Sequence, residues 1–269
     1  CVDYAWSLAE ETPAAADVVL VATPAGQASA ALADLAPRLP EATFAAWALQ
    51  WDPIPGLEGS PAQHRIVLGY PDSGGTRNEA GRYVLSLGAE PNVGPFAGGG
   101  SAARDRVEQV RELLASADLR PAMHDPFEPW LWVHCALTVP YWVALAQDRS
   151  MSGFLGDGRR LRRAFRASHE MLRLCEARGV DLTRHPEVDT VRLPALLFPF
   201  AFRMLMRTNE SMRRVTAHAV AGIEEGIVLC REALRTAAEL DVAVPELRHL
   251  AEDAGIAEPA RVAPSTLSA

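Results

Sequence analysis

The first half of the chain alternates between short apolar runs and helical patterns. The run VVLVAT, residues 18–23, is rich in β-branched residues and shows no polar alternation, which is typical of a parallel strand covered on both faces. The next segment, GQASAALADLAPRL, places its apolar residues on one side of a helix, namely Ala28, Leu32 and Leu35, and Pro40 closes it. Further strands are predicted at residues 42–50, 64–70 and 81–88. This order of strands and helices predicts an α/β fold.

A glycine-rich segment, GPFAGGGS at residues 94–101, predicts a flexible loop whose Ser101 caps the following helix. That helix is predicted over residues 102–117. Its apolar stripe consists of Val107, Val110, Leu114 and Ala117, with the charges opposite. We expect the stripe to pack on the sheet.

After Pro121 the pattern changes to long helices. They are predicted at residues 129–148, 157–178, 193–207, 210–240 and 246–253. The uncharged run from Trp130 is marginal for a membrane span and contains His134 and Thr138, so we expect a buried core helix. We therefore place a domain boundary near residues 123–128. The prediction is an α/β domain of residues 1–124, followed by an all-helical substrate and dimerisation domain of residues 125–269.

The composition is that of a soluble globular protein. With 269 residues, 49% of them hydrophobic, the chain can bury one large core or two smaller ones. A net charge of −8 does not favour nucleic acid or an anionic membrane as a partner. Four widely spaced cysteines without a CxxC pair favour a reducing cytoplasm. The start of the chain lacks a signal-peptide pattern, and since it also lacks an initiator methionine we expect a fragment or processed form.

Several strings, in this order, resemble the ketopantoate reductase (2-dehydropantoate 2-reductase) family. They are DVVLVATPAGQASAALADLAP, RIVLGYPDSGGTR, EPWLWVHCALTVP and EEGIVLCREALRTAAELDVAVPEL. The resemblance implies a partial Rossmann-like parallel sheet followed by a helical domain of ketopantoate reductase type. It also implies NADPH-dependent reduction of a small keto acid or related carbonyl in a cleft between the domains.

The chain departs from the family at its main motifs. The glycine fingerprint G-x-G-x-x-G, which lets a pyrophosphate approach a helix N-terminus, is absent from the 269 residues. We expect the first β-α-β segments, roughly 60 residues in such folds, to be missing. Pro24 stands where the family has a lysine facing the cofactor, Trp51 replaces the asparagine of its QNG motif, and Trp132 occupies the position of the catalytic lysine. Glu225 keeps the place of the family's glutamate.

Some members of the family have the strings VLGFPGAGG, KTHAAFVAP and GHARAxxxEM. The corresponding strings of this chain are VLGYPDSGG, WVHCALTVP and AHAVAGIEEG. This resemblance puts His134, His218 and Glu225 on matched positions as candidate catalytic residues. The resemblance also implies candidate substrate-binding and cofactor-binding residues. The substrate candidates are Thr138, Trp51 and Ser211, and the cofactor candidates are Thr23, Pro24, Gln27 and Gln50.

Carbonyl reduction needs a proton donor near the developing alkoxide, and a histidine can supply it near neutral pH. His134 fits this role, with Thr138 one turn later on the same face, while a core histidine bonded to a backbone carbonyl is the alternative. His218 and Glu225 would lie two turns apart, about 10.5 Å, on one helix face. The small residues between them leave a concavity for a polar ligand or, alternatively, permit close helix packing.

Other motifs carry less chemistry. The arginine run at residues 158–166 is best explained as the charged face of an amphipathic helix, and no metal-binding or serine-hydrolase motif is present in the sequence. Two hypotheses stay open. The first is an NADP-dependent keto-acid reductase acting on a small molecule, with a homodimer as an option. The second is a repurposed scaffold that binds a ligand or catalyses a non-redox reaction. The sequence leaves the substrate, the choice between NADP and NAD, and the oligomeric state open.

Overall fold

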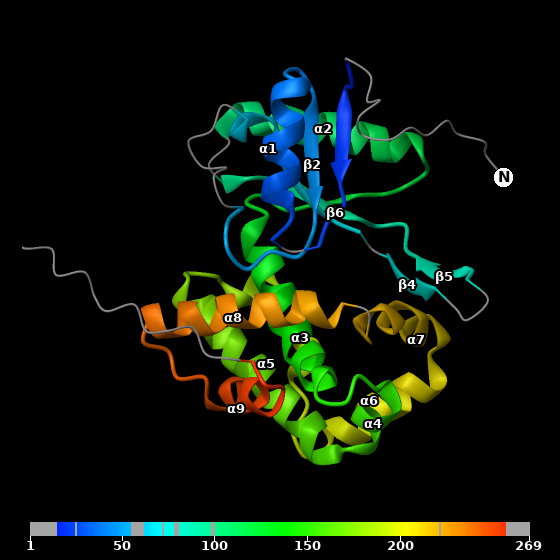
Figure 1. Ribbon diagram of the computed structural model, residues 1–269, viewed down its shortest axis with the longest axis vertical. Helices are drawn as coiled ribbons and strands as arrows, with labels where there is room; N and C mark the ends of the chain where they lie inside the picture. Colours follow the sequence, from blue (N-terminus) through cyan, green and yellow to red (C-terminus); the bar gives the residue numbers. More distant parts are fainter. Residues whose placement is uncertain are drawn as a thin grey trace, which may run out of the picture.

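A computed structural model describes residues 15–256, apart from residues 25, 55–61, 72, 78–80, 98–99 and 221. The sheet part comes first along the chain and lies above the helical part in Figure 1. The last strand of the sheet ends at Met123 and the first helix of the lower part begins at Glu128. The change in architecture therefore falls where the hydrophobic pattern changes.

Five strands form the main sheet, in the order β1-β2-β3-β6-β7. Their bounds are Val18–Val21 (β1), Thr43–Trp47 (β2), Ile66–Tyr70 (β3), Asn92–Pro95 (β6) and Ala122–Met123 (β7). The strands β1, β2 and β3 are parallel, with Ala45 of β2 paired to Leu20 on one side and Val67 on the other. Strand β6 runs antiparallel to β3. The sequence does not predict β6, because its glycine and proline favour a loop until a neighbouring strand supplies the hydrogen bonds.

Helices cover both faces of this sheet (Figure 1). Helix α1 (Ala28–Arg38) packs on one face and α2 (Gly100–Ser116) on the other. Alternate residues of β2 point to opposite faces, so Phe44 joins the core that contains Leu32 of α1, whereas Ala45 packs with Val110 of α2. The buried stripe of α2 is Ala103, Val107, Val110 and Leu114. Two details differ from expectation: Ser101 lies inside the first turn, and Ala117 follows the end of α2 and is exposed.

A second, two-stranded sheet is a hairpin of β4 (Ser73–Arg77) and β5 (Tyr83–Leu87). Only β5 is predicted from the sequence. The hairpin extends from the main sheet towards α7 in Figure 1 and contacts α7 and the short helix η6. It thus joins the two parts of the molecule on one side.

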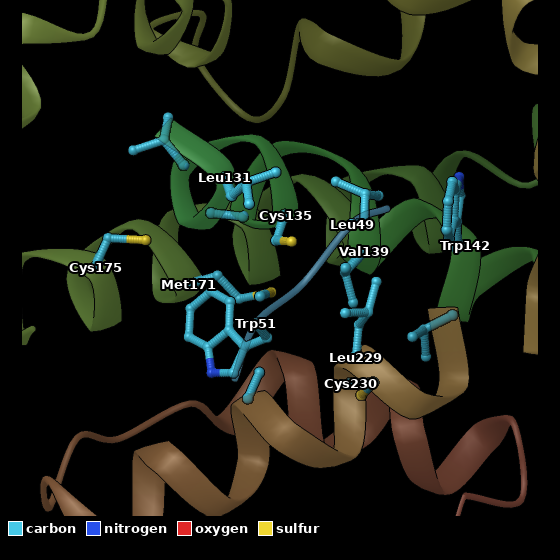
Figure 2. Close-up of a cluster of buried hydrophobic side chains, with 14 of the residues drawn as sticks. Leu49, Trp51, Leu131, Cys135, Val139, Trp142, Met171, Cys175, Leu229 and Cys230 are labelled. Atoms are coloured by element: carbon cyan, nitrogen blue, oxygen red, sulfur yellow. The ribbon is translucent and has the colours of Figure 1, made fainter. Parts of the chain in front are cut away.

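The helical part is built around α3. Its helices are α3 (Glu128–Ala146), α4 (Met151–Gly156), α5 (Gly158–Ala177), α6 (Phe198–Thr208), α7 (Glu210–Thr216), α8 (Ile223–Glu239) and α9 (Pro245–Asp253), with short 3-10 turns η4 (Leu182–Arg184), η5 (Pro186–Val191) and η6 (Ala217–Val220). A further 3-10 turn, η2 (Gln63–Arg65), lies in the sheet part just before β3. Helix α3 packs against α5, α8 and α9 and is the buried core helix that the sequence predicts. Figure 2 shows side chains of α3, α5 and α8 meeting Leu49 and Trp51, which follow β2. Within the described segments, no helix is both long and apolar enough to cross a bilayer.

The prediction of one continuous helix over residues 210–240 is wrong. The chain instead forms α7, η6 and α8, with Gly222 as the residue before α8. The Gly222 amide donates a hydrogen bond to the His218 carbonyl at 2.8 Å, and Ala219 is buried at the break. Tertiary contacts of this segment with β4 and α3 outweigh the helical pattern.

Candidate functional site

The carboxyl ends of β1 and β2 meet at one edge of the sheet, and three of the predicted cofactor residues lie after β1. The turn between β1 and α1 contains Thr23, Pro24 and Gln27, and it is closed by a hydrogen bond of 3.1 Å from the Gln27 amide to the Pro24 carbonyl. Gly26 has φ +83° in this turn, a conformation that favours glycine. Gln50 follows β2 at the same edge. The structure therefore brings these four residues to one edge.

A cavity of about 420 Å³ opens at this edge. It is bordered by the start of α1, the segment after β2 and the second half of α8. Its polar lining residues are Ser29, Gln50, Asp52, Glu232 and Arg235. Open α/β sheets bind ligands outside the carboxyl ends of their strands, which makes this cavity a candidate ligand site.

Charges are concentrated on one side of the cavity. Asp52 forms ion pairs with Arg235 and, at 3.4 Å, with Arg178. Burial raises the pKa of Glu232 to about 7, and the neighbouring Asp52 charge acts in the same direction. A hydrogen bond from the Asp52 backbone amide partly opposes that shift. Glu232 can therefore hold a proton near neutral pH, which suits a general acid.

Two buried polar atoms at this edge have no hydrogen-bond partner among the described residues. They are the Thr23 hydroxyl oxygen and the Gln50 side-chain amide nitrogen. Leaving a buried polar group unpaired costs about 1–3 kcal/mol, so such groups usually have a reason in ligand binding or ordered water. Gln50 also lines the cavity. Both groups can hydrogen-bond a ligand.

His134 lies in an aromatic cluster on α3. Its ring stacks on Trp130 with centroids 5.1 Å apart and lies 4.5 Å from the Tyr70 ring at the end of β3. Burial, aided by His218, lowers the pKa of His134 to about 4. The imidazole is therefore neutral at pH 7. Thr138 donates its hydroxyl to the His134 carbonyl at 2.8 Å, a bond within α3.

The other candidates lie on separate elements. His218 belongs to η6, edge-on to Trp142 with centroids 5.8 Å apart. Glu225 lies half-buried in the first turn of α8, and Ser211 is exposed on α7. His218 and Glu225 therefore do not share a continuous helix face, which corrects the two-turn spacing expected from the sequence. The structure places His134 and His218 close enough to interact electrostatically.

Trp51 and Trp132 form part of the core. The Arg178 guanidinium lies 4.4 Å from the Trp51 ring and 4.6 Å from the Trp132 ring. Trp51 has no exposed surface, and its indole donates to Thr236 at 3.0 Å. The Trp132 indole and Arg178 both donate to the Trp51 carbonyl, at 2.9 and 2.8 Å. Because its ring is enclosed and paired, Trp51 is not available to a substrate, which corrects its assignment as a binding residue.

Sequence reasoning missed Glu232, Arg235 and Arg178. A signal for Glu232 was present, because it lies seven residues after Glu225 and so on the same face of α8. Nothing local indicates that Arg235 and Arg178 meet Asp52, which is distant from both in the chain.

No family model and no curated protein matches the chain. Solved structures do match. The complex of D-mandelate dehydrogenase with NADH has a TM-score of 0.64 at 12% identity, over 89% of this chain and 77% of that one. A 2-dehydropantoate 2-reductase from Geobacter metallireducens GS-15 has a TM-score of 0.63 at 19% identity, over 89% of this chain and 76% of that one. A dimeric ketopantoate reductase from Staphylococcus aureus has a TM-score of 0.60 at 11% identity, over 91% of this chain and 78% of that one.

The class of protein follows from these likenesses together with the architecture. It is a two-part protein with a Rossmann-like sheet domain and a helical domain. More particularly, the chain has the fold of the ketopantoate reductases, which D-mandelate dehydrogenase shares. The fold implied by the sequence resemblance is thereby confirmed.

Proposed function

We propose that this protein is a nicotinamide-dependent oxidoreductase that reduces a small keto acid or related carbonyl. One observation carries the proposal. A chain with the fold of ketopantoate reductases holds two unpaired buried polar groups, Thr23 and Gln50, at the sheet edge where such folds bind ligands. The partner is a small molecule, and we further propose that the protein is a homodimer.

The residues at this edge fit one end of a dinucleotide. The Gln50 amide nitrogen can donate a hydrogen bond, and the Thr23 hydroxyl can donate and accept. The first turn of α1 presents backbone amides, since Gln27 makes no side-chain cap there. Because the 269 residues contain no G-x-G-x-x-G sequence, we assign these groups to the nicotinamide–ribose end and assign no residue to the pyrophosphate. When bound, the cofactor supplies the hydride.

Two side chains can supply the proton to the carbonyl oxygen. His134 is neutral at pH 7, and the carboxylate of a keto acid beside it would favour its charged form. Glu232 holds a proton near neutral pH and lines the cavity with Gln50. We propose His134 as the donor, with Glu232 as the second candidate in the same reaction.

The binding experiment is a titration of the full chain with NADPH and with NADH, followed by fluorescence or calorimetry. We expect binding, and a loss of about 5-fold in affinity for each of Thr23→Val and Gln50→Leu, the effect of one neutral hydrogen bond. Gln63→Leu, a half-buried glutamine on η2, is the matched control and should bind as the wild type does. No binding of either nucleotide at millimolar concentration would refute the proposal.

The kinetic experiment separates the two proton donors. With 2-dehydropantoate and phenylglyoxylate as trial substrates, His134→Ala should lower kcat by about 100-fold, the usual contribution of a general acid. Glu232→Gln should then have a small effect. The reverse result would move the role to Glu232. His64→Ala, at an exposed position outside the site, is the control.

A second candidate function has one observation in its favour. The positions where the family resemblance places an asparagine and a lysine hold Trp51 and Trp132, and Arg178 fills the space between their rings. This packing favours a scaffold that binds a small acid without redox chemistry. It predicts that keto or hydroxy acids raise the melting temperature while neither nucleotide binds.

A further inference from the structure

Helix α6 is apolar on two opposite sides. One side faces the core, where Phe198 and Met206 are buried and Phe202 stacks on Tyr141 with centroids 5.8 Å apart. The other side faces solvent. Leu196 is 78% exposed, Phe200 69% and Met204 46%. Contiguous exposed apolar residues of this kind mark a surface that contacts a partner, although the helix also carries Arg203 and Arg207.

The exposed residues form one continuous surface. Leu196, in the turn before α6, and Phe200 and Met204, on the helix, follow a spacing of four and so lie on one side of this segment. Leu193 and Leu197, which precede α6, and Leu205, which follows Met204, are also exposed. We call these six residues the α6 patch. It lies in the lower part of the molecule in Figure 1, away from the sheet and from the candidate site.

The size of the α6 patch suits a second copy of the chain. Its side chains expose on the order of 600 Å² of apolar surface, close to the ~800 Å² per partner of a standard interface and at the upper end for a monomer. A symmetric dimer uses the same surface on both copies. The α6 patch can meet itself, because a two-fold axis at Phe200 sets Leu196 of one copy against Met204 of the other.

Charged residues of both signs flank the α6 patch at each end. Asp189 and Arg192 form an ion pair just before the patch, and Arg207 and Glu210 come just after it. When the start of one patch faces the end of the other, segments of mixed charge meet at both ends. Each flanking cluster carries both signs, so neither end of the interface meets a block of a single charge.

We infer that the α6 patch is the interface of a homodimer in which α6 of one copy packs antiparallel on α6 of the other. The inference deepens the homodimer of the proposed function and names its surface. It does not depend on the proposed reaction, because a mass measurement needs neither cofactor nor substrate. A negative nucleotide titration and a negative dimer test are therefore distinct results.

The first test is light scattering or sedimentation of the full chain at micromolar concentration. The wild type should have twice the mass of one chain, 29.1 kDa. Phe200→Asp should raise the dissociation constant about 30-fold or more, as expected for a central interface residue. Leu113→Asp on α2, at a residue that is 47% exposed outside the patch, should leave the dimer intact.

The second test reports on the geometry. Phe200→Cys places two thiols at the two-fold axis, so mild oxidation should link the two copies, and Leu113→Cys should not. A monomeric wild type, a dimer that survives Phe200→Asp, or equal cross-linking of the two cysteine variants would overturn the inference. Since both positions are exposed, the substitutions do not disturb the core, and circular dichroism verifies this.

Discussion

At the scale of single residues, burial decides what the candidate histidine can do. The chain neighbours of His134, Val133 and Cys135, are both fully buried, and the His134 ring packs against those of Trp130 and Tyr70. A charged imidazolium is costly there, which is why the pKa falls to about 4. The same burial affects catalysis and stability, because a group that resists protonation makes the folded state sensitive to acid.

The pH dependence of stability tests this directly. Well above pH 6.5 the imidazole is neutral in both the folded and the unfolded chain. As the pH falls, the unfolded chain binds the proton first, so the folded state loses about 2 kcal/mol between pH 7 and pH 5 through this group. When the free energy of unfolding is measured with denaturant at pH 7 and at pH 5, the loss between these two pH values should be smaller by about 2 kcal/mol in His134→Gln than in the wild type. His64→Gln should show the same loss as the wild type, and equal losses in all three proteins would mean that His134 is hydrated.

At the scale of elements, the close approach of α3 and α8 requires a glycine at the point where the two helices cross. A Cβ atom at Gly226 would lie 2.6 Å from the Cβ of Trp142, too close for the two helices to keep their distance. Gly222, one turn earlier, has more room, since its nearest contact would be the His218 carbonyl at 3.5 Å. Close packing at this crossing brings η6, with His218, beside α3.

Substitution by alanine distinguishes these two glycines. Gly226→Ala should destabilise the protein by about 1–3 kcal/mol, the usual effect of overpacking, although alanine favours helices. Gly222→Ala should be close to neutral, and its φ of −87° suits alanine. Thermal unfolding of both variants gives the comparison. A stabilised Gly226→Ala protein would show that α3 and α8 separate easily.

At the scale of the whole molecule, Arg178 ties the sheet part to the helical part. It follows α5 and reaches the Trp51 carbonyl, the Asp52 carboxylate and the Thr236 hydroxyl. Asp52 in turn is held by Arg235 at the edge of the cavity. The segment after β2, which carries Gln50, is thereby fixed against α5 and α8.

Removing this arginine should weaken the whole fold. Arg178→Ala is expected to destabilise the protein by about 3 kcal/mol, because a carbonyl, a carboxylate and a hydroxyl each lose a partly buried hydrogen bond and two indole faces lose their cation. Arg178→Lys should recover only part of that, since lysine lacks the planar donor array. Arg173→Ala, at an exposed position on α5, is the control. If Arg178→Ala had the same free energy of unfolding as Arg173→Ala, other contacts would hold the sheet part and the helical part together.

Much of the fold is local and was therefore predictable. Apolar runs without alternation identify β1, β2 and β3, and the helical spacing identifies α1, α2, α3 and α5. The elements that were missed have weak local preferences. Strand β6 contains glycine and proline, and the break between α7 and α8 interrupts an amphipathic pattern. In both cases neighbouring segments determine the conformation.

The sequence by itself determined most of the strands and helices and the change from sheet to helices, because hydrophobic periodicity acts over a few residues, and the family resemblance singled out Thr23, Gln50 and His134. Only the tertiary structure decided which of these groups are unpaired, which are buried and which charges meet. Trp51, Arg178 and Thr236 are distant in the chain, and folding alone brings them into contact. The pKa of Glu232 has the same origin, since burial and the nearby Asp52 are properties of the packed molecule.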